Sequence, residues 1–111
     1  MPQEPIIMRK WSSRIRTEDR QAYVDYVLET GGRDYAQTQG NLGYQVLTLD
    51  LGDGSTIITT LSWWESMLAV RKFAGPEPEI ARYYPEDDRF LLERPRNVEH
   101  YVVEGGRLDI G

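Results

Sequence analysis

Hydrophobic positions along this chain follow a strand-like pattern in four separate stretches. Residues 6–15 read IIMRKWSSRI, which is rich in β-branched and aromatic side chains without glycine or proline and predicts a first strand. Residues 44–51 (YQVLTLDL) and 55–64 predict two more strands, joined as a β-hairpin by a short turn over residues 52–54. Residues 97–104 (NVEHYVVE) predict the last strand.

Helical spacing of apolar side chains occupies the interval after the first strand. In residues 17–30 these side chains recur three and four positions apart, which predicts a helix. Thr17 is a favourable N-cap residue, and the pair Gly31 and Gly32 supplies a C-terminal stop. The glycines and asparagine of residues 40–43 (GNLG) then predict a turn before the second strand.

A second helical interval follows the third strand. Residues 65–75 predict a helix that ends at a glycine. Pro76 favours the first turn of a further short helix, and Pro85 closes it because the residue before a proline is pushed out of helical geometry. Residues 87–93 predict another turn or short helix with apolar side chains directed inward.

The resulting order is β-α-β-β-α-β, which is a split βαβ unit. This order predicts an α+β protein with a ferredoxin-like antiparallel sheet and helices on one face. At 111 residues the chain forms a single domain, expected over residues 1–104, with a loose tail over residues 105–111.

The strands are apolar on both faces. In the second strand Val46 lies on one face, while Leu47, Leu49 and Leu51 lie on the other. A sheet with one face in water alternates between apolar and polar residues, so both faces of this sheet are expected to be covered. The helices cover one face, and the sheet of an identical subunit is the simplest cover for the other. The sequence therefore predicts a homodimer in which two sheets form a barrel.

Composition excludes several classes of function. The net charge is −5 and basic residues form no long cluster, so we expect no nucleic-acid partner. The chain has no cysteine, which excludes disulfides and zinc–thiolate sites and suits the cytoplasm. No apolar run approaches the length of about 20 residues that crosses a membrane, so no membrane association is expected. No phosphate-binding, dinucleotide-binding or zinc-protease motif is present.

Several short segments carry a resemblance to a known family. These segments are GNLG at 40–43, SWWES at 62–66, FAG at 73–75, ARYYPED at 81–87 and VEHY at 98–101. Together with the strand order they resemble the antibiotic biosynthesis monooxygenase superfamily, closest to its small, mostly uncharacterised bacterial branch. The resemblance implies a dimeric α+β barrel. It also implies an activity such as cofactor-free oxygenation of anthrones or quinols, or heme degradation, and does not choose among them.

The resemblance places Trp64 where relatives have a pocket tryptophan at the end of a strand. Trp64 is therefore either an aromatic wall for a flat phenolic ligand or a filler of the core between sheet and helix. Trp63 should face the opposite way, toward the dimer contact. Heme degradation is disfavoured, because Tyr83 stands where a heme-ligating histidine is expected and residues 8–11 contain no asparagine. No cofactor is expected.

Candidate site residues follow from these considerations. The candidates for catalysis are Trp64, Tyr83, His100 and Arg14, and the candidates for the substrate pocket are Trp11, Asn41, Arg82, Tyr84 and Phe73. Most of them have a structural alternative: His100 as a hydrogen-bonding strand residue, Asn41 as a turn residue, and the two tyrosines as a packed helix end. The acidic run at residues 86–88 is interpreted as a solvated helix cap, and no metal site is expected.

The leading hypothesis is a cofactor-independent, monooxygenase-type enzyme that acts on a small phenolic or quinol-like compound. Its first alternative is a non-catalytic dimer that binds a small molecule or serves in a stress response. A second alternative is a dimer that acts only as a stable partner for another protein.

Overall fold

A four-stranded antiparallel sheet forms one layer of the molecule. The computed structural model describes residues 4–107. The strands are β1 (Ile7–Arg16), β2 (Asn41–Asp50), β3 (Ser55–Trp64) and β4 (Glu99–Val102), and their order in the sheet is β2-β3-β1-β4. This order is that of a ferredoxin-like sheet, so the predicted α+β fold is confirmed.

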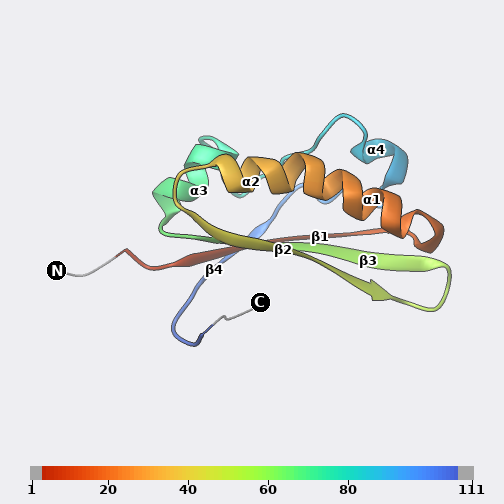
Figure 1. Ribbon diagram of the computed structural model, residues 1–111, viewed down its shortest axis with the longest axis horizontal. Helices are drawn as coiled ribbons and strands as arrows, with labels where there is room; N and C mark the ends of the chain where they lie inside the picture. Colours follow the sequence, from red (N-terminus) through yellow and green to blue (C-terminus); the bar gives the residue numbers. More distant parts are fainter. Residues whose placement is uncertain (1–3, 108–111) are drawn as a thin grey trace.

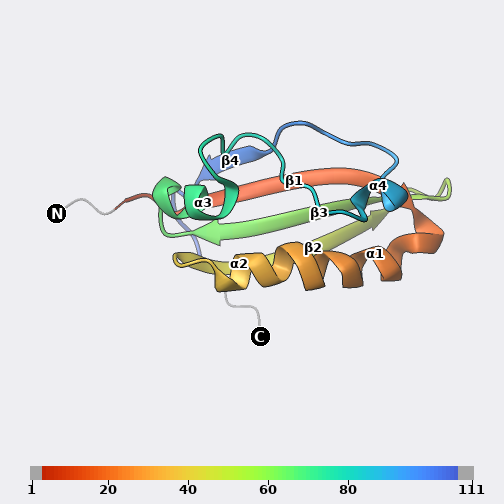
Figure 2. The same ribbon diagram turned by 90° about the horizontal axis from the view of Figure 1, so that it is seen from above.

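The helices form the second layer, on one face of the sheet (Figure 1). A long helical segment begins with a 3₁₀ turn and continues as α1, a π-helical turn and α2 along the β2 side of the sheet (Figure 2). The shorter helices α3 and α4 lie over the neighbouring strands. The helical bounds are Thr17–Asp19 for the 3₁₀ turn, Arg20–Val27 for α1, Leu28–Gly32 for the π-helical turn, Arg33–Gln37 for α2, Met67–Ala74 for α3 and Asp87–Phe90 for α4.

The two glycines predicted to stop the first helix lie inside it instead. The helix continues through Gly31 and Gly32 as a π-helical turn and ends at Gln37. Both glycines are buried, and a Cβ atom on Gly32 would lie 3.1 Å from the ring of Tyr44. Glycine is therefore used here for close packing of the helix on β2 rather than for a left-handed stop. The predicted N-cap is also wrong, because the Thr17 hydroxyl bonds to Thr56 and caps no helix.

The short helix predicted between Pro76 and Pro85 does not form. Residues 76–86 run as an irregular segment, which we call the covering segment. Its backbone finds other partners: Ala81 N–H donates to Arg96 O at 2.8 Å, and Val98 N–H donates to Glu79 O at 2.8 Å. These hydrogen bonds to residues just before β4 replace the hydrogen bonds that a helix would form within itself.

The other predicted elements shift by small amounts. Strand β2 begins three residues earlier than expected because Asn41 pairs with Trp64 across a bulge that precedes Gly43. Helix α3 has the predicted stop, Gly75, at a φ of 87°. Of the tail expected to be loose, residues 108–111 lie outside the described residues.

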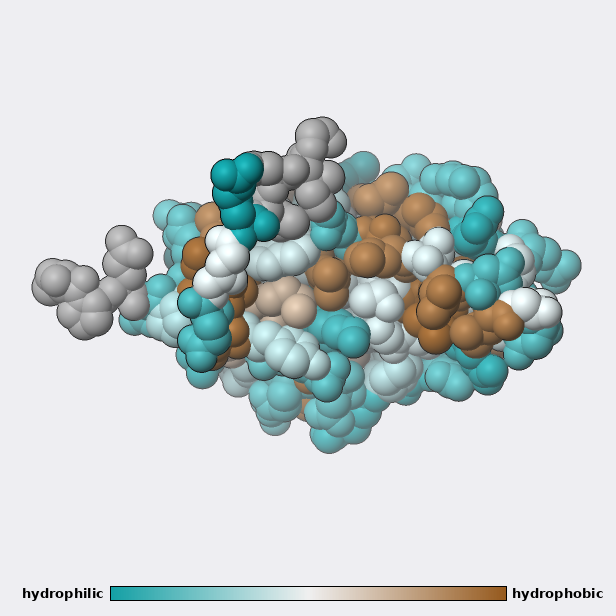
Figure 3. All heavy atoms as spheres, turned by 90° about the horizontal axis from the view of Figure 1, so that it is seen from below, coloured by the Kyte–Doolittle hydropathy of each residue, from teal (hydrophilic) through white to brown (hydrophobic). Residues whose placement is uncertain are grey.

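The opposite face of the sheet is apolar, as the strand pattern predicted, and it is exposed in the single chain. Leu47, Leu49 and Leu51 are 42%, 59% and 43% exposed there. Figure 3 shows this face, with hydrophobic residues gathered over the sheet. We call this surface the open face. Within residues 4–107 no helix is long and apolar enough to cross a membrane.

Candidate functional site

A small cavity lies between the sheet and the helical layer. Its volume is about 40 Å³, which accommodates a few water molecules at roughly 10–15 Å³ each. The lining comes from the two inner strands, the long helical segment, α3, the covering segment, the start of α4 and the residue just before β4. The lining residues are Arg9, Trp11, Tyr23, Val27, Thr30, Gly31, Tyr35, Thr60, Phe73, Arg82, Tyr83, Tyr84, Asp87 and Val98.

Trp11 and Tyr83 form one aromatic wall of the cavity. Their rings meet edge to face at 76° with 6.2 Å between centroids, and the Trp11 indole N–H donates to the Tyr83 hydroxyl at 3.2 Å. That hydroxyl donates in turn to the Pro95 carbonyl, and the Arg94 guanidinium lies 4.4 Å from the centroid of the Tyr83 ring. Burial raises the pKa of Tyr83, so its hydroxyl stays protonated at neutral pH.

A polar cluster fixes the covering segment to the long helix. Asp34 on α2 accepts a hydrogen bond from the Tyr84 hydroxyl at 2.5 Å and pairs with Arg82 at 3.1 Å. Arg82 also donates to the Phe73 carbonyl at 2.8 Å, which ties α3 to the same cluster. Burial, and secondly the hydrogen bond to Asp34, raise the pKa of Tyr84. The cluster holds the Tyr84 ring in the cavity wall.

Asp87 is a buried carboxylate in the cavity lining. It is only 4% exposed, and it accepts hydrogen bonds from the Tyr23 hydroxyl at 2.9 Å and from the Tyr84 N–H at 2.6 Å. Burial and the neighbouring carboxylate raise the pKa of Tyr23. The interpretation of residues 86–88 as a solvated cap is therefore wrong for Asp87. Its partner Tyr23 lies far away in the sequence, so the local pattern carried no signal of burial.

Arg9 is a buried cation in the same lining, and the candidates drawn from the sequence did not include it. It is 3% exposed and donates to the Pro78 carbonyl, to the Ile80 carbonyl at 3.4 Å and to His100 Nε2 at 3.0 Å. Burial lowers the pKa of its guanidinium. The signal that points to Arg9 is the alternation of β1, because this residue shares a strand face with Trp11.

His100 lies behind Arg9 rather than in the cavity wall. It sits on β4, opposite Arg9 in the pairing of the two strands. Because a guanidinium only donates, Nε2 of His100 accepts, and the ring is neutral in this arrangement. Burial, and secondly the charge of Arg9, lower the pKa of His100. The ring acts here as a hydrogen-bond partner of Arg9.

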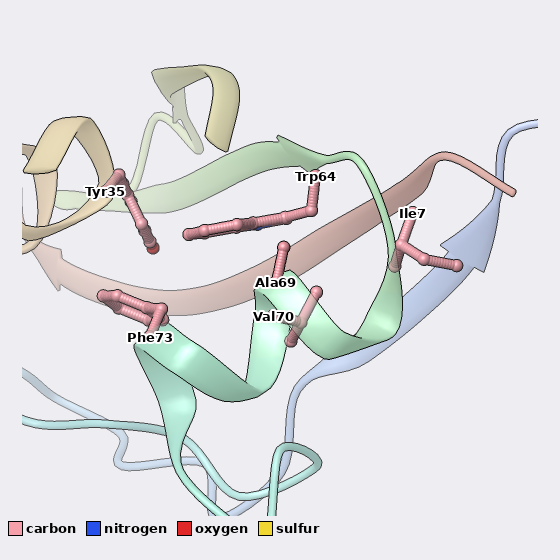
Figure 4. Packing of buried hydrophobic residues seen from close by; sticks show 6 residues of the cluster. All are labelled: Ile7, Tyr35, Trp64, Ala69, Val70 and Phe73. Atoms are coloured by element: carbon pink, nitrogen blue, oxygen red, sulfur yellow. The ribbon is translucent and has the colours of Figure 1, made fainter. Parts of the chain in front are cut away.

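Trp64 belongs to the core and does not line the cavity. It is fully buried between the sheet and α3, in contact with the cluster drawn in Figure 4. Its ring centroid lies 6.0 Å from Tyr35 and 5.6 Å from Phe73, and these two rings separate it from the cavity. Its indole N–H donates to Ser62 Oγ at 2.8 Å. Of the two interpretations drawn from the sequence, the one in which Trp64 fills the core between sheet and helix therefore describes its position.

The remaining candidates lie outside the cavity. Arg14 pairs with Glu93 at 3.1 Å. The Asn41 side chain donates to the carbonyls of Gly43 and Trp63 at 3.3 and 3.2 Å, so Asn41 supports the bulge at the start of β2 and is not the turn residue that was expected. The cavity thus brings together five predicted residues, Trp11, Phe73, Arg82, Tyr83 and Tyr84. Within residues 4–107 no group of three or more His, Cys, Asp or Glu side chains is placed to hold a metal ion.

Comparison with known proteins identifies the fold. No family model matches the chain, and no curated protein matches it. Among solved structures, a candidate antibiotic biosynthesis monooxygenase from Bacillus cereus is similar over 95% of this chain and 99% of its own, at 15% identity and a TM-score of 0.60. A Streptomyces coelicolor monooxygenase in complex with nanaomycin D is similar over 99% of this chain and 96% of its own, at 15% identity and a TM-score of 0.56.

A heme-degrading protein from Mycobacterium tuberculosis has the same fold. It is similar over 97% of this chain and 98% of its own, at 14% identity and a TM-score of 0.54. At such identities the likeness establishes the fold alone. The chain therefore has the ferredoxin-like α+β fold of the antibiotic biosynthesis monooxygenases, and a function has to be argued from its own cavity.

Proposed function

We propose, from the fold shared with antibiotic biosynthesis monooxygenases, that this chain is a cofactor-independent, monooxygenase-type enzyme acting on a small phenolic or quinol-like compound. The observation that carries the proposal is the composition of the cavity lining. Aromatic side chains from β1, α3 and the covering segment surround a space that also presents the buried carboxylate of Asp87. Flat rings favour a flat ligand, and a buried carboxylate is suited to accept a proton from it.

The chemistry needs only the substrate, molecular oxygen and a proton acceptor. An activated methylene flanked by phenolic rings loses a proton, and its anion reduces oxygen. Both oxygen atoms are accounted for when the methylene becomes a ketone and one water is released. Asp87 accepts the proton in this scheme, and the Tyr83 hydroxyl, which stays protonated because burial raises its pKa, donates to the substrate once it releases the Pro95 carbonyl.

Binding of such a compound requires the cavity to widen. A benzene-sized ligand occupies a cavity of roughly 150 Å³, whereas this one measures about 40 Å³. The covering segment is the wall suited to move, because it lacks regular structure between α3 and α4. Its contacts with Asp34, Trp11 and Arg9 are side-chain hydrogen bonds that can re-form around a ligand.

Heme does not fit this lining. The cavity has room for a few waters, the hydroxyl of Tyr83 is engaged by Trp11 and Pro95, and the chain's single histidine, His100, bonds to Arg9. The residues present offer neither a free axial ligand nor the space for a porphyrin. Heme degradation remains disfavoured for this chain.

One alternative is a dimer that binds a small molecule without converting it, because the aromatic cavity wall suits a flat ligand whether or not that ligand reacts. A binding protein needs the aromatic wall but no proton acceptor. The two functions therefore differ in the role of Asp87, whose carboxylate is essential only for turnover.

A homodimer is part of the proposal. The open face holds an apolar groove of about 480 Å³, lined by Met8, Lys10, Leu47, Thr48, Leu49, Ile57, Thr59, Leu61 and Tyr101. The open face exposes several large apolar side chains (Figure 3), and the two-fold partner that buries them most simply is the same face of a second copy.

Oxygen uptake by the purified protein tests the enzymatic proposal. With a panel of anthrones and hydroquinones and no added cofactor, the wild type should consume oxygen above the buffer rate. Asp87→Asn should lower that rate by roughly 100-fold or more, since general-base catalysis contributes about 10² to 10⁴. Asp25→Asn is the matched control because Asp25 is an exposed carboxylate on α1 that is not part of the cavity lining.

Oxygen uptake at the buffer rate with every compound of the panel would rule out the enzymatic proposal and favour the non-catalytic binding dimer. Unchanged turnover in a folded Asp87→Asn variant would remove Asp87 from the mechanism. Circular dichroism of each variant shows whether it is folded.

A further inference from the structure

Arg9 carries a buried positive charge without a counter-ion. It is 3% exposed, and no carboxylate oxygen among residues 4–107 lies within the 4.0 Å of an ion pair with it. An arginine does not become neutral by losing its proton, because its guanidinium stays protonated throughout the pH range in which proteins are folded. Burying an unpaired charge is costly, so this arrangement calls for a compensating anion.

The acidic groups around the cavity are committed to other partners. Asp34 is paired with Arg82 and accepts the Tyr84 hydroxyl. Asp87 accepts from Tyr23 and from a backbone N–H. Neither carboxylate therefore neutralises Arg9 in this structure.

The guanidinium also retains hydrogen-bonding capacity. An arginine side chain has five N–H donors. Three acceptors are present for Arg9 among the described residues: the carbonyls of Pro78 and Ile80, and Nε2 of His100. The Ile80 contact is long, at 3.4 Å. Because Arg9 lines the cavity, a ligand oxygen placed there can occupy the remaining donors.

We propose that Arg9 is the anion-binding residue of the cavity, and that the ligand is a flat aromatic compound carrying a negatively charged oxygen, as a carboxylate or a phenolate. The guanidinium matches such a planar oxyanion through paired N–H donors. The Phe73 ring, 5.6 Å from the Arg9 guanidinium, and the Trp11 ring line the same cavity and make it aromatic. This inference rests on the proposed function only for the premise that the cavity takes an aromatic ligand; it does not require turnover.

Benzoate and benzamide form a matched pair of probes, because they have nearly the same shape and differ in charge. Their dissociation constants for the full chain are measured by NMR titration at pH 7.5. We expect benzoate to bind at least about tenfold more tightly, as a charge-assisted hydrogen bond predicts. The indole N–H signal of Trp11 should shift on binding, while that of Trp63, on the open face, should not.

Variants then assign the charge preference to Arg9. Arg9→Met should abolish the preference for benzoate, and Arg9→Lys should retain part of it as a point charge. Arg71→Met is the matched control, because Arg71 is an exposed arginine on α3. It should leave both constants unchanged. Arg9→Met also removes the contacts to Pro78 and Ile80, so the wild-type comparison of the two probes decides the outcome if this variant does not fold.

Equal affinities in the wild type would overturn the proposal, as would no binding of either probe at millimolar concentration. A preference that survives in a folded Arg9→Met variant would also overturn it. Phenolate-bearing ligands are distinguished from carboxylates by a titration with 4-nitrophenol above and below its own pKa. A charge preference without any oxygen uptake would leave this inference standing while the enzymatic proposal fails.

Discussion

The three tryptophans of this chain occupy three different environments. Trp11 lies in the cavity wall and bonds to Tyr83. Trp63 faces the open side of the sheet, and Trp64 is fully buried under α3. Trp63 and Trp64 are adjacent in sequence, yet the alternation of a strand sends them to opposite faces. The same residue type therefore serves a cavity, an exposed apolar surface and a core.

Replacement of Trp64 by phenylalanine should destabilise the fold. The substitution leaves space beside Tyr35 and Phe73 and removes the donor to Ser62 Oγ, which is itself buried. We expect the free energy of unfolding to fall by about 2 kcal/mol. Urea denaturation at a fixed protein concentration measures this change.

Trp63→Phe provides the control, because it changes the same side chain on the partly exposed face. It should cost less than about 1 kcal/mol. An equal loss in both variants would contradict the assignment of Trp64 to the core. Oxygen uptake per folded molecule should be unaffected by Trp64→Phe if Trp64 is outside the site.

At the scale of elements, the long helix and the covering segment shape the cavity between them. The helix contributes Tyr23, Tyr35 and Gly31, and the covering segment contributes the run from Arg82 to Tyr84. The π-helical turn between α1 and α2 places two glycines at the point where the helix passes closest to neighbouring rings. Side-chain volume at this turn should therefore determine how well the two layers fit.

The two glycines of this turn should respond differently to alanine. A Cβ on Gly31 would meet Tyr84 at 3.8 Å, an ordinary contact, whereas a Cβ on Gly32 would lie 3.1 Å from Tyr44. Alanine in a helix is favoured over glycine by roughly 0.5–1 kcal/mol. Gly31→Ala should thus raise the free energy of unfolding by about that amount, and Gly32→Ala should gain less or lose. Chemical denaturation of the two variants compares them directly, and the opposite ranking would contradict the packing described here.

The whole molecule has one covered face and one uncovered apolar face. The helices bury one side of the sheet, and the other side exposes leucines of β2 together with apolar residues of β1, β3 and β4. Large exposed apolar patches on folded domains mark interaction sites. The sequence places apolar residues on both faces of the strands, so the apolar character of this surface follows directly from the sequence.

A charge placed on the open face should prevent the proposed dimer. We expect light scattering on the wild type to give twice the chain mass of 12.9 kDa, and Leu49→Asp to give the monomer mass. An unpaired carboxylate buried in each half of a two-fold contact should weaken association by about 100-fold or more. Leu68→Asp is the control, since Leu68 is 65% exposed on α3, away from the open face. A wild-type monomer at micromolar concentration would contradict the dimer.

The pattern of hydrophobic and polar residues along the sequence was sufficient to predict the fold class. Strand β3 begins and ends where the sequence predicted, because its β-branched and aromatic residues favour a strand and the glycines before it form a short turn. The helix stop at Gly31 and the helix after Pro76 were wrong for one shared reason. In both places the local signal of glycine and proline was overruled by distant partners, Tyr44 in the first case and Arg9 with residues 96–98 in the second.

The sequence by itself determined the ferredoxin-like topology and the two apolar faces, because the first follows from the order of the elements along the chain and the second from the periodicity within each strand. Only the tertiary structure decided which polar groups face the cavity. It placed Trp11 and Tyr83 together and moved Trp64 into the core. It also buried Arg9 and Asp87, whose partners lie far away along the chain. Burial and charge pairing are set by contacts between elements, and a pattern read along one element does not contain them.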